Sequence, residues 1–317
     1  MNDLKIILAT GTMSEDGWRD ALAQAFAAAG LRCDLAVWDG RPHGARYAVV
    51  WLPPAELFAA EPGLRAVFNL GAGVDALLAR GMVPAPLPIL RLVDAGMAPK
   101  IAEYVCFAIA RIVRGLERFG PPPGGLRDWN ASRPRGDAPV VGVLGLGAIG
   151  AAIVEAAVRF GYPVRGWSRR PRAIAGVETF AGPAWFDAFL ARTEVLVNAL
   201  PLTAQTENLL DRRAFAQMPR GVHLINVGRG GTVADDDLVA ALDSGQLASA
   251  TLDVFRVEPL PPGHAFWSHP KITVTPHLSG PTPYGPAAEQ IAAALTQLEH
   301  GVQARDLPGY VDRAAGY

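Results

Sequence analysis

The stretch Val140–Gly150 decides the fold, and it reads Val-Val-Gly-Val-Leu-Gly-Leu-Gly-Ala-Ile-Gly. A short apolar strand runs directly into a glycine-rich turn, and an alanine-rich, helix-forming run then ends near Gly161. Further β-rich runs follow at 163–167, 195–199, 222–227, 250–254 and 272–275. Strands that alternate with helices are typical of a parallel sheet covered by helices, and six at this spacing complete a doubly wound domain.

The glycines of the turn have the Gly-x-Gly-x-x-Gly spacing of a dinucleotide-binding unit. Gly145 permits the tight turn, Gly147 lets the backbone approach a pyrophosphate, and Gly150 lets the helix pack closely on the strand. The first helical residues, Ala148 and Ile149, add free N–H groups and a dipole that favours phosphate. A tight turn without a ligand would explain a glycine triplet alone, but the strand before it and the helix after it favour a Rossmann nucleotide site.

The end of the second strand of this unit carries Trp167-Ser168-Arg169-Arg170. An acidic residue for the ribose 2′-hydroxyl of NAD would stand there, and it is missing. Two arginines and a hydroxyl would instead pair with a 2′-phosphate through charge-assisted hydrogen bonds. NADP(H) is therefore the preferred cofactor and NAD(H) a possible one, although Arg169 and Arg170 could also form a solvated loop.

The 317 residues predict two domains, because the chain exceeds what one hydrophobic core usually serves. Strand- and helix-like runs alternate from the N-terminus, at 5–9, 16–29, 33–37 and 47–51. A long helix is predicted from Met97 to about Phe119, and a last helix near 286–300 has no strand after it. We expect an α/β protein with two doubly wound parallel-sheet domains: a Rossmann nucleotide domain, 98–284, inserted in a flavodoxin-like substrate domain, 1–97 with 285–317.

Composition excludes several classes of function. Lys+Arg (29) and Asp+Glu (30) nearly cancel, so no overall positive field is available for nucleic acid or an anionic membrane. The N-terminus lacks a signal-peptide pattern and no apolar run reaches membrane-spanning length, which predicts a cytoplasmic location. Cys33 and Cys106 are not spaced for a metal or a disulfide framework, so we expect buried free thiols and no metal site.

Three later strands each end in a side chain suited to hydride transfer on a 2-keto acid. Arg229 lies in Val-Gly-Arg-Gly, Glu258 follows Asp253-Val-Phe, and His277 ends Thr-Pro-His. The carboxyl ends of parallel strands meet at one edge, so we expect these groups in one crevice. They would supply a cation for the carboxylate and carbonyl, a carboxylate, and a proton donor that the carboxylate holds charged. Singly they could be a surface ion-pair member, a loop carboxylate and a core histidine; together they favour catalysis.

With these segments the sequence resembles the D-isomer-specific 2-hydroxyacid dehydrogenase family over essentially its whole length. The resemblance implies that Arg229, Glu258 and His277 are catalytic and that the amides of Ala72 and Gly73 hold the substrate carboxylate. By analogy, residues 198–203 and Gly280 lie along the cofactor and Asp253 lies near the nicotinamide. The full set of further cofactor contacts expected on the same basis is Leu200, Pro201, Thr206, Val227, Gly228, Arg229, Asp253, His277 and Gly280.

Within the family the sequence resembles the bacterial glyoxylate and hydroxypyruvate reductases of the A type. This resemblance rests on the segments Trp51-Leu-Pro-Pro, Gly96-Met97, Glu103-Tyr104 and the Trp-Ser-Arg loop. Lys100 departs from it, because an uncharged residue is expected at that position. The resemblance implies NADPH preference, small 2-keto acid substrates, and Trp51 and Met97 as substrate contacts. A proline-rich arm at 121–125 and Trp129 resemble the dimerisation segment of the family and imply a homodimer.

Two alternatives stay open. Another 2-keto acid of the phosphoglycerate or phenylpyruvate type could be the substrate, since the substrate motifs match less closely than the catalytic ones. A dinucleotide-sensing interaction module is a different class of function, because some members of the family act as transcriptional corepressors. An intact Arg229, Glu258 and His277 argues against the module.

Overall fold

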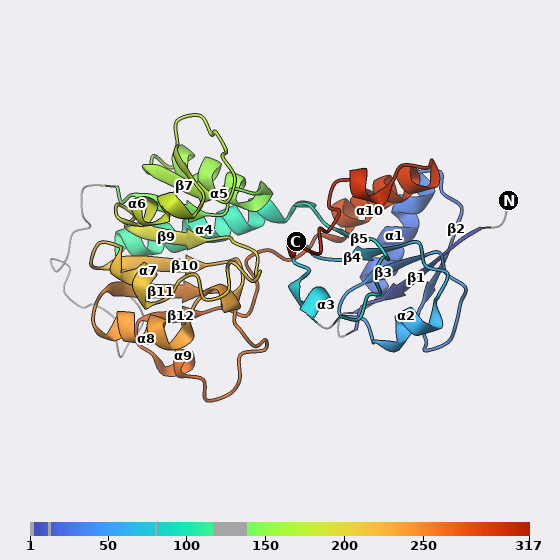
Figure 1. Cartoon of the computed structure of the whole chain (residues 1–317), viewed down its shortest axis with the longest axis horizontal. Helices are drawn as coiled ribbons and strands as arrows, with labels where there is room; N and C mark the ends of the chain where they lie inside the picture. Colours follow the sequence, from blue (N-terminus) through green and yellow to red (C-terminus); the bar gives the residue numbers. More distant parts are fainter. Residues whose placement is uncertain (1–2, 12–13, 80, 117–137) are drawn as a thin grey trace. The chain divides into compact units, whose positions relative to one another are not determined.

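The computed structural model describes residues 3–11, 14–79, 81–116 and 138–317 (Figure 1). The chain divides into two compact units, one of Met1–Met97 with Thr282–Tyr317 and one of Ala98–Pro281. The predicted arm at 121–125 and Trp129 lie outside the described residues. Within the described part of the chain, no helix has the length and apolar character needed to cross a membrane.

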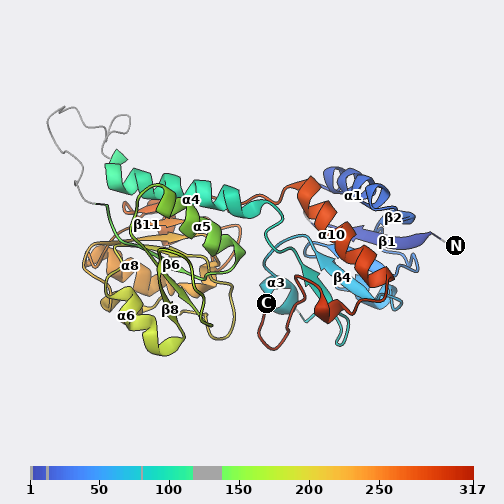
Figure 2. The ribbon, with the colours of Figure 1, turned by 90° about the horizontal axis from the view of Figure 1, so that it is seen from above.

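The first unit is built on a five-stranded parallel sheet of order β2-β1-β3-β4-β5. The strands are β1 (Leu4–Ala9), β2 (Cys33–Val37), β3 (Tyr47–Val50), β4 (Ala66–Asn69) and β5 (Ile89–Arg91), and the helices are α1 (Asp16–Ala28), α2 (Glu56–Ala60), α3 (Asp75–Ala79) and α10 (Tyr284–Glu299). Helices α1 and α10 lie side by side (Figure 2), and the rings of Trp18 and Tyr284 meet edge to face, 4.8 Å between centroids. The C-terminal segment thus completes the core of the N-terminal one.

The second unit holds a seven-stranded parallel sheet of order β12-β11-β10-β9-β6-β7-β8. Its strands are β6 (Val141–Leu144), β7 (Val164–Ser168), β8 (Glu178–Ala181), β9 (Val195–Asn198), β10 (Val222–Asn226), β11 (Leu247–Leu252) and β12 (Ile272–Val274). Its helices are α4 (Met97–Arg114), which begins at the unit boundary, α5 (Ala148–Arg159), α6 (Phe186–Leu190), α7 (Arg212–Ala216), α8 (Asp235–Asp243) and α9 (Ala265–Ser268). Two parallel sheets with helices confirm the predicted α/β class.

Burial explains why the central strands form where the sequence predicts them. Every residue of β6 and β9 is buried, as expected for parallel strands covered on both faces. The strand β6 pairs with β7 on one side and β9 on the other, the crossover at which doubly wound sheets bind nucleotides. The core of this unit is formed by apolar residues such as Leu196, Leu224 and Phe189.

Two expectations were incomplete or wrong. The sequence predicted six strands in the second unit, and the structure has a seventh, β8, which reads Glu-Thr-Phe-Ala and has no buried residue. Arg165 ties this strand to β7, because its Nε donates to Glu178 at 2.7 Å. Both cysteines are free, but only Cys106 is buried; Cys33 is partly exposed, because it begins the edge strand β2.

Candidate active site

Six loops leave the same edge of the second sheet. All seven strands are parallel, so the segments that follow β6, β7, β9, β10, β11 and β12 emerge together. The predicted cofactor residues and the three predicted catalytic residues lie in or beside these segments. This edge is therefore the candidate active site of the second unit.

The glycine-rich turn shows that its three glycines serve different purposes. Gly145 has φ +93°, which only glycine adopts readily, and a Cβ on Gly150 would lie 1.7 Å from the Gly145 carbonyl oxygen. Gly147 has φ −71°, caps α5, and has open space where its Cβ would be. The fold therefore requires glycine at 145 and 150 but not at 147, where the open space leaves room for a ligand close to the backbone. The residues here fit a dinucleotide pyrophosphate.

The loop after β7 carries the predicted 2′-phosphate group. The Ser168 hydroxyl donates to the Arg170 carbonyl at 2.7 Å and so shapes the turn, while Arg169 and Arg170 are exposed. Arg172 is a third exposed arginine in the same loop, which the sequence analysis did not single out. Guanidinium groups at this position suit the 2′-phosphate of NADP(H).

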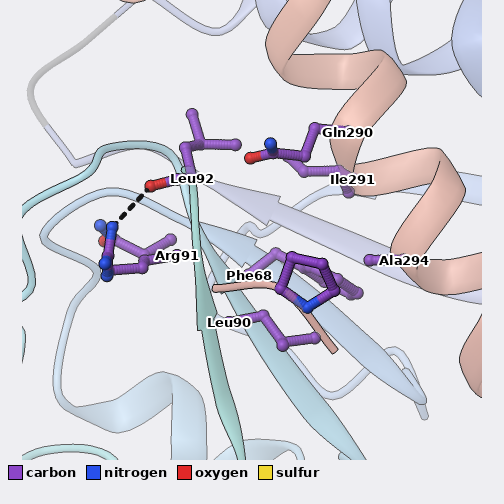
Figure 3. Close-up of a pocket in the computed structure, with 9 residues that line it drawn as sticks. Phe68, Leu90, Arg91, Leu92, Gln290, Ile291 and Ala294 are labelled. Atoms are coloured by element: carbon purple, nitrogen blue, oxygen red, sulfur yellow. Dashed lines mark hydrogen bonds between the residues drawn. The ribbon is translucent and has the colours of Figure 1, made fainter. Parts of the chain in front are cut away.

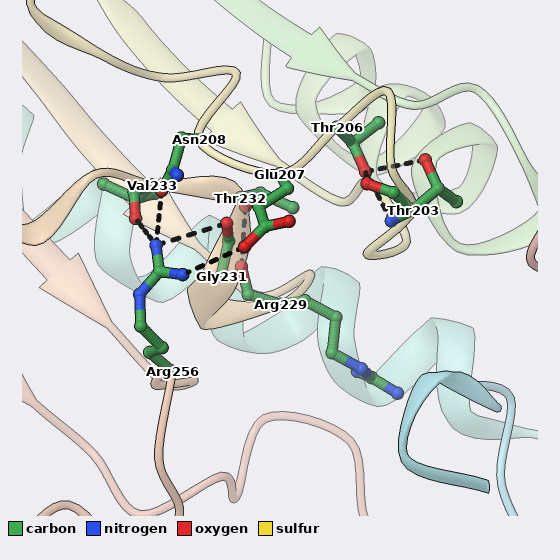
Figure 4. A network of polar contacts seen from close by, with 9 residues as sticks. All are labelled: Thr203, Thr206, Glu207, Asn208, Arg229, Gly231, Thr232, Val233 and Arg256. Carbon is green, nitrogen blue, oxygen red and sulfur yellow. Dashed lines mark hydrogen bonds and ion pairs between the residues drawn. The ribbon is translucent and has the colours of Figure 1, made fainter. Parts of the chain in front are cut away.

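The loop after β9 is held together by its own threonines. The Thr206 hydroxyl donates to the Pro201 carbonyl at 2.6 Å. It also accepts from the Thr203 amide at 2.8 Å (Figure 4). Leu200 is buried, and Pro201 is exposed. The predicted cofactor residue Thr206 thus fixes the shape of this loop.

Arg229 lies on a turn whose backbone is fastened by buried polar side chains. Thr232 and Asn226 both donate to the Arg229 carbonyl, at 2.6 and 3.2 Å. Asn198 donates to Asn226 at 2.9 Å and to the Thr232 hydroxyl at 2.7 Å. A Cβ on Gly230 would lie 1.9 Å from the Phe255 carbonyl carbon. The turn that presents Arg229 therefore has little freedom to move. Of the other two predicted contacts on it, Val227 and Gly228 are buried.

Arg256 joins this turn to the loop after β9. Its guanidinium donates to the Val233 carbonyl at 2.9 Å and to the Asn208 side chain, and it pairs with Glu207 at 3.6 Å. Figure 4 shows the Arg229 side chain extending away from this network. Arg256 thus binds neighbouring loops, whereas Arg229 points elsewhere.

Glu258 and His277 form a direct pair. Nδ1 of His277 lies 2.7 Å from Oε2 of Glu258, and the Phe255 amide donates to Oε1 of Glu258 at 2.8 Å. Partial burial acts to raise the pKa of Glu258, yet the hydrogen bonds from His277 and Phe255 and the charges of His277 and Arg229 outweigh it, so the pKa lies below its usual range. The His277 side chain is 44% exposed, so its ring is accessible from solvent. Gly280 follows, partly buried.

The first unit places three of its predicted substrate contacts, Trp51, Ala72 and Gly73, at one loop. The Trp51 ring packs on Gly71, where a Cβ would lie 2.4 Å from a ring carbon. The Asn69 amide donates to the carbonyls of Gly71 and Gly73, at 3.0 and 2.9 Å, which fixes the loop that contains Ala72. Met97 differs, because its side chain is only 4% exposed.

A small pocket in the first unit is lined mainly by residues of β4, β5 and α10 (Figure 3). Its polar residues are Asn69, Arg91 and Gln290. Nη1 of Arg91 donates to the Leu92 carbonyl at 3.0 Å, and burial lowers the pKa of Arg91. Trp51, Ala72, Gly73 and Met97 are not part of its lining.

Sequence reasoning missed the side chains that hold the site in shape: Asn226, Thr232 and Arg256. Asn198 and Asn226 each end a buried strand and pair in register. The sequence shows their positions at the strand ends, but not their hydrogen bonds to Thr232 and to the Arg229 carbonyl. In the described ranges, no group of three or more His, Cys, Asp or Glu side chains gathers as a metal site.

Comparisons with known proteins agree with this geometry. The family model for the NAD binding domain of D-isomer specific 2-hydroxyacid dehydrogenases matches residues 128–279. A glyoxylate/hydroxypyruvate reductase A from Serratia proteamaculans is 40% identical over 99% of this chain and 100% of its own. A solved D-isomer specific 2-hydroxyacid dehydrogenase from Xanthobacter autotrophicus Py2, in complex with NADPH and MES, has a TM-score of 0.90 at 39% identity and covers 100% of both chains. The NADPH-dependent glyoxylate/hydroxypyruvate reductase from Sinorhizobium meliloti, in complex with NADP and sulfate, has a TM-score of 0.88 at 32% identity, over 99% of this chain and 100% of its own.

Proposed function

Because the chain belongs to the D-isomer-specific 2-hydroxyacid dehydrogenase family, we propose that it uses NADPH to reduce a small 2-keto acid of the glyoxylate or hydroxypyruvate type to the D-2-hydroxy acid. The single observation that carries the proposal is the pair of His277 Nδ1 and Glu258 Oε2, 2.7 Å apart, at the sheet edge that also bears the glycine-rich turn. The relatives that are reductases of these acids support the substrate class.

The chemistry follows from which atoms of the pair are engaged. Glu258 accepts the Nδ1 proton of His277, which leaves Nε2 as the nitrogen that donates a proton to the oxygen of the forming alkoxide. Arg229 supplies a cation for the substrate carboxylate and the keto oxygen. When bound at this site, NADPH would supply the hydride for the keto carbon. Hydride and proton together convert the carbonyl to a secondary alcohol, or to a primary one with glyoxylate.

We assign the cofactor to the turn Gly145–Gly150 and to Ser168, Arg169 and Arg170. The open space at Gly147 admits a pyrophosphate, and the exposed arginines match a 2′-phosphate. Relatives with bound NADPH or NADP support this choice. Thr206 and Gly280 remain predicted contacts along the cofactor. Asp253 was predicted to lie near the nicotinamide, but in the structure it is fully buried and its carboxylate accepts hydrogen bonds from Thr275, Leu278 and Ser279.

On the substrate side, the amides of Ala72 and Gly73 are proposed to hold the carboxylate. The Asn69 side chain donates hydrogen bonds to the neighbouring carbonyls of Gly71 and Gly73. The loop backbone is fixed by these bonds, which supports a role for its amides in substrate binding. Trp51 packs on the same loop and would limit the size of the substrate. We also propose a homodimer, which light scattering at low protein concentration would test.

The first experiment compares NADPH oxidation with glyoxylate, hydroxypyruvate, phenylpyruvate and 3-phosphohydroxypyruvate. We expect the first two to be the best substrates, and His277→Ala to lower their reduction by about 100-fold to 10,000-fold while NADPH still binds. The control is His300→Ala, at the exposed end of α10. Near-native turnover by His277→Ala would remove its assigned role, and oxidation with none of the acids would favour the dinucleotide-sensing module.

The second experiment tests cofactor choice. The double variant Arg169→Asp, Arg170→Asp should prefer NADH, because a 2′-phosphate would then face carboxylates. The control, Arg159→Asp with Arg212→Asp, makes the same change in net charge at exposed arginines away from the loop. Unchanged preference in the first variant, or an equal shift in the control, would contradict the phosphate assignment.

A further inference from the structure

The Asp253 carboxylate, fully buried, is the centre of a hydrogen-bond network that holds the chain on both sides of His277. Its Oδ1 accepts from the Thr275 hydroxyl at 2.6 Å and from the Leu278 amide at 2.9 Å, and its Oδ2 accepts from the Ser279 amide at 2.9 Å. The His277 amide also donates to the Asp253 carbonyl at 2.9 Å. Residues on both sides of His277 are thus bound to one side chain.

The backbone of His277 needs such support. Its φ of +51° lies in the left-handed region, which a residue with a Cβ adopts only where its surroundings impose it. The three donors to Asp253 come from residues 275, 278 and 279, so they fix the chain immediately before and after this strained position. The orientation of the His277 ring toward Glu258 depends on the same backbone.

The network continues to α4 through Tyr104. The Tyr104 hydroxyl lies 2.7 Å from the Thr275 hydroxyl, which has already given its one proton to Asp253. Tyr104 is therefore the donor in this contact, since a hydroxyl has only one proton to give. Burial, with the nearby charge of Asp253, raises the pKa of Tyr104, so the hydroxyl keeps the proton that it donates. Tyr104 belongs to the Glu103-Tyr104 motif, and the proposed reaction assigns no role to this motif.

We propose that Tyr104 and Thr275 are positioning residues for the proton donor: the chain of hydrogen bonds from Tyr104 through Thr275 to Asp253 holds residues 275–279 in the conformation that directs His277 at Glu258. The inference rests on the proposed role of His277 in the reaction. Neither residue needs to touch substrate or cofactor for this purpose.

The test removes the hydroxyl of Thr275 while keeping its shape, in Thr275→Val. Asp253 then loses one donor and Tyr104 its acceptor, so we expect kcat to fall about tenfold or more with the KM for NADPH changed less than about twofold. Thr275→Ser keeps the hydroxyl and should restore most of kcat, and Tyr104→Phe should show a smaller loss. Amide hydrogen exchange at Leu278 and Ser279 should become faster in Thr275→Val and Tyr104→Phe.

A matched control separates positioning from general docking of α4. Nη1 of Arg111, also on α4, donates to the Thr273 hydroxyl of β12 at 3.0 Å. Thr273→Val therefore removes a hydrogen bond between α4 and a residue two positions before Thr275 without touching Asp253, and it should leave kcat and the exchange at 278 and 279 unchanged.

The exchange measurement does not depend on turnover, so the two proposals fail separately. Absence of keto acid reduction by the wild-type protein would reject the proposed function, while the exchange rates would still decide whether Thr275 holds the segment. Unchanged exchange in Thr275→Val, no recovery in Thr275→Ser, or an equal effect of Thr273→Val would overturn the positioning role.

Discussion

Replacing Gly147 by alanine should weaken NADPH binding while leaving the fold nearly intact. Its φ of −71° is open to any residue, and nothing lies within 4 Å of the added Cβ. Alanine is a poorer N-cap than glycine, which costs about 1 kcal/mol, or roughly 2–4 °C in Tm. The methyl group occupies the space through which a pyrophosphate would approach, so we expect NADPH affinity to fall about tenfold or more, equivalent to about 1.4 kcal/mol.

Gly150→Ala is the matched comparison, three residues along the same motif. Its Cβ would lie 1.7 Å from the Gly145 carbonyl oxygen, so the backbone must move. Overpacking of this kind costs about 3 kcal/mol, which lowers Tm by roughly 6–12 °C. Fluorescence titration with NADPH and thermal unfolding of both variants measure the two effects. Unchanged NADPH affinity in Gly147→Ala, or an unchanged Tm in Gly150→Ala, would refute the division of the motif into a ligand glycine and a packing glycine.

Two further predictions concern the pair of His277 and Glu258. Because the pKa of Glu258 is lowered in the folded state, the stabilisation by its carboxylate is present above the unfolded pKa of glutamate, about 4.3, and is lost as the pH falls through the folded value. The Tm advantage of the wild type over Glu258→Gln should therefore persist from neutral pH to about pH 4.3 and shrink as the pH falls further. An advantage that stays constant or grows below about pH 4.3 would contradict the shift. His277→Gly should be more stable than His277→Ala by about 1 kcal/mol, since only glycine relieves a φ of +51°. Thermal unfolding of the two inactive variants checks this, and equal Tm values would argue against strain at 277.

The sequence predicted the central strands because burial on both faces makes them nearly continuous apolar runs, as in Val195–Asn198. It could not predict β8, since an edge strand with a charged and a hydroxyl residue lacks that pattern. The partial exposure of Cys33 has a related cause. An apolar run shows that a strand forms, but its place at the sheet edge depends on strand order, which is a property of the whole sheet.

The sequence could predict which residues of the candidate site lie at the ends of strands. Arg229, Glu258 and His277 follow predicted strands, and parallel strands bring their ends together whatever their separation along the chain. The supporting contacts were not predictable, because they join distant residues through single hydrogen bonds: Asn198 and Thr232 are 34 positions apart, and Tyr104 and Thr275 are 171 apart. No spacing rule connects such pairs.

His277 shows how local preference and chemistry conflict at this site. A backbone with φ +51° favours glycine, and the sequence places an imidazole there. Strain of this kind persists only where surrounding contacts impose it, and here the buried Asp253 carboxylate binds the chain before and after the ring. The effect of replacing Asp253 or Thr275 therefore cannot be inferred from direct contacts of these residues with a ligand. In the proposed role, their effect on the reaction is transmitted through the conformation of His277, which is why substitutions at Thr275 and Tyr104 should change kcat more than the KM for NADPH.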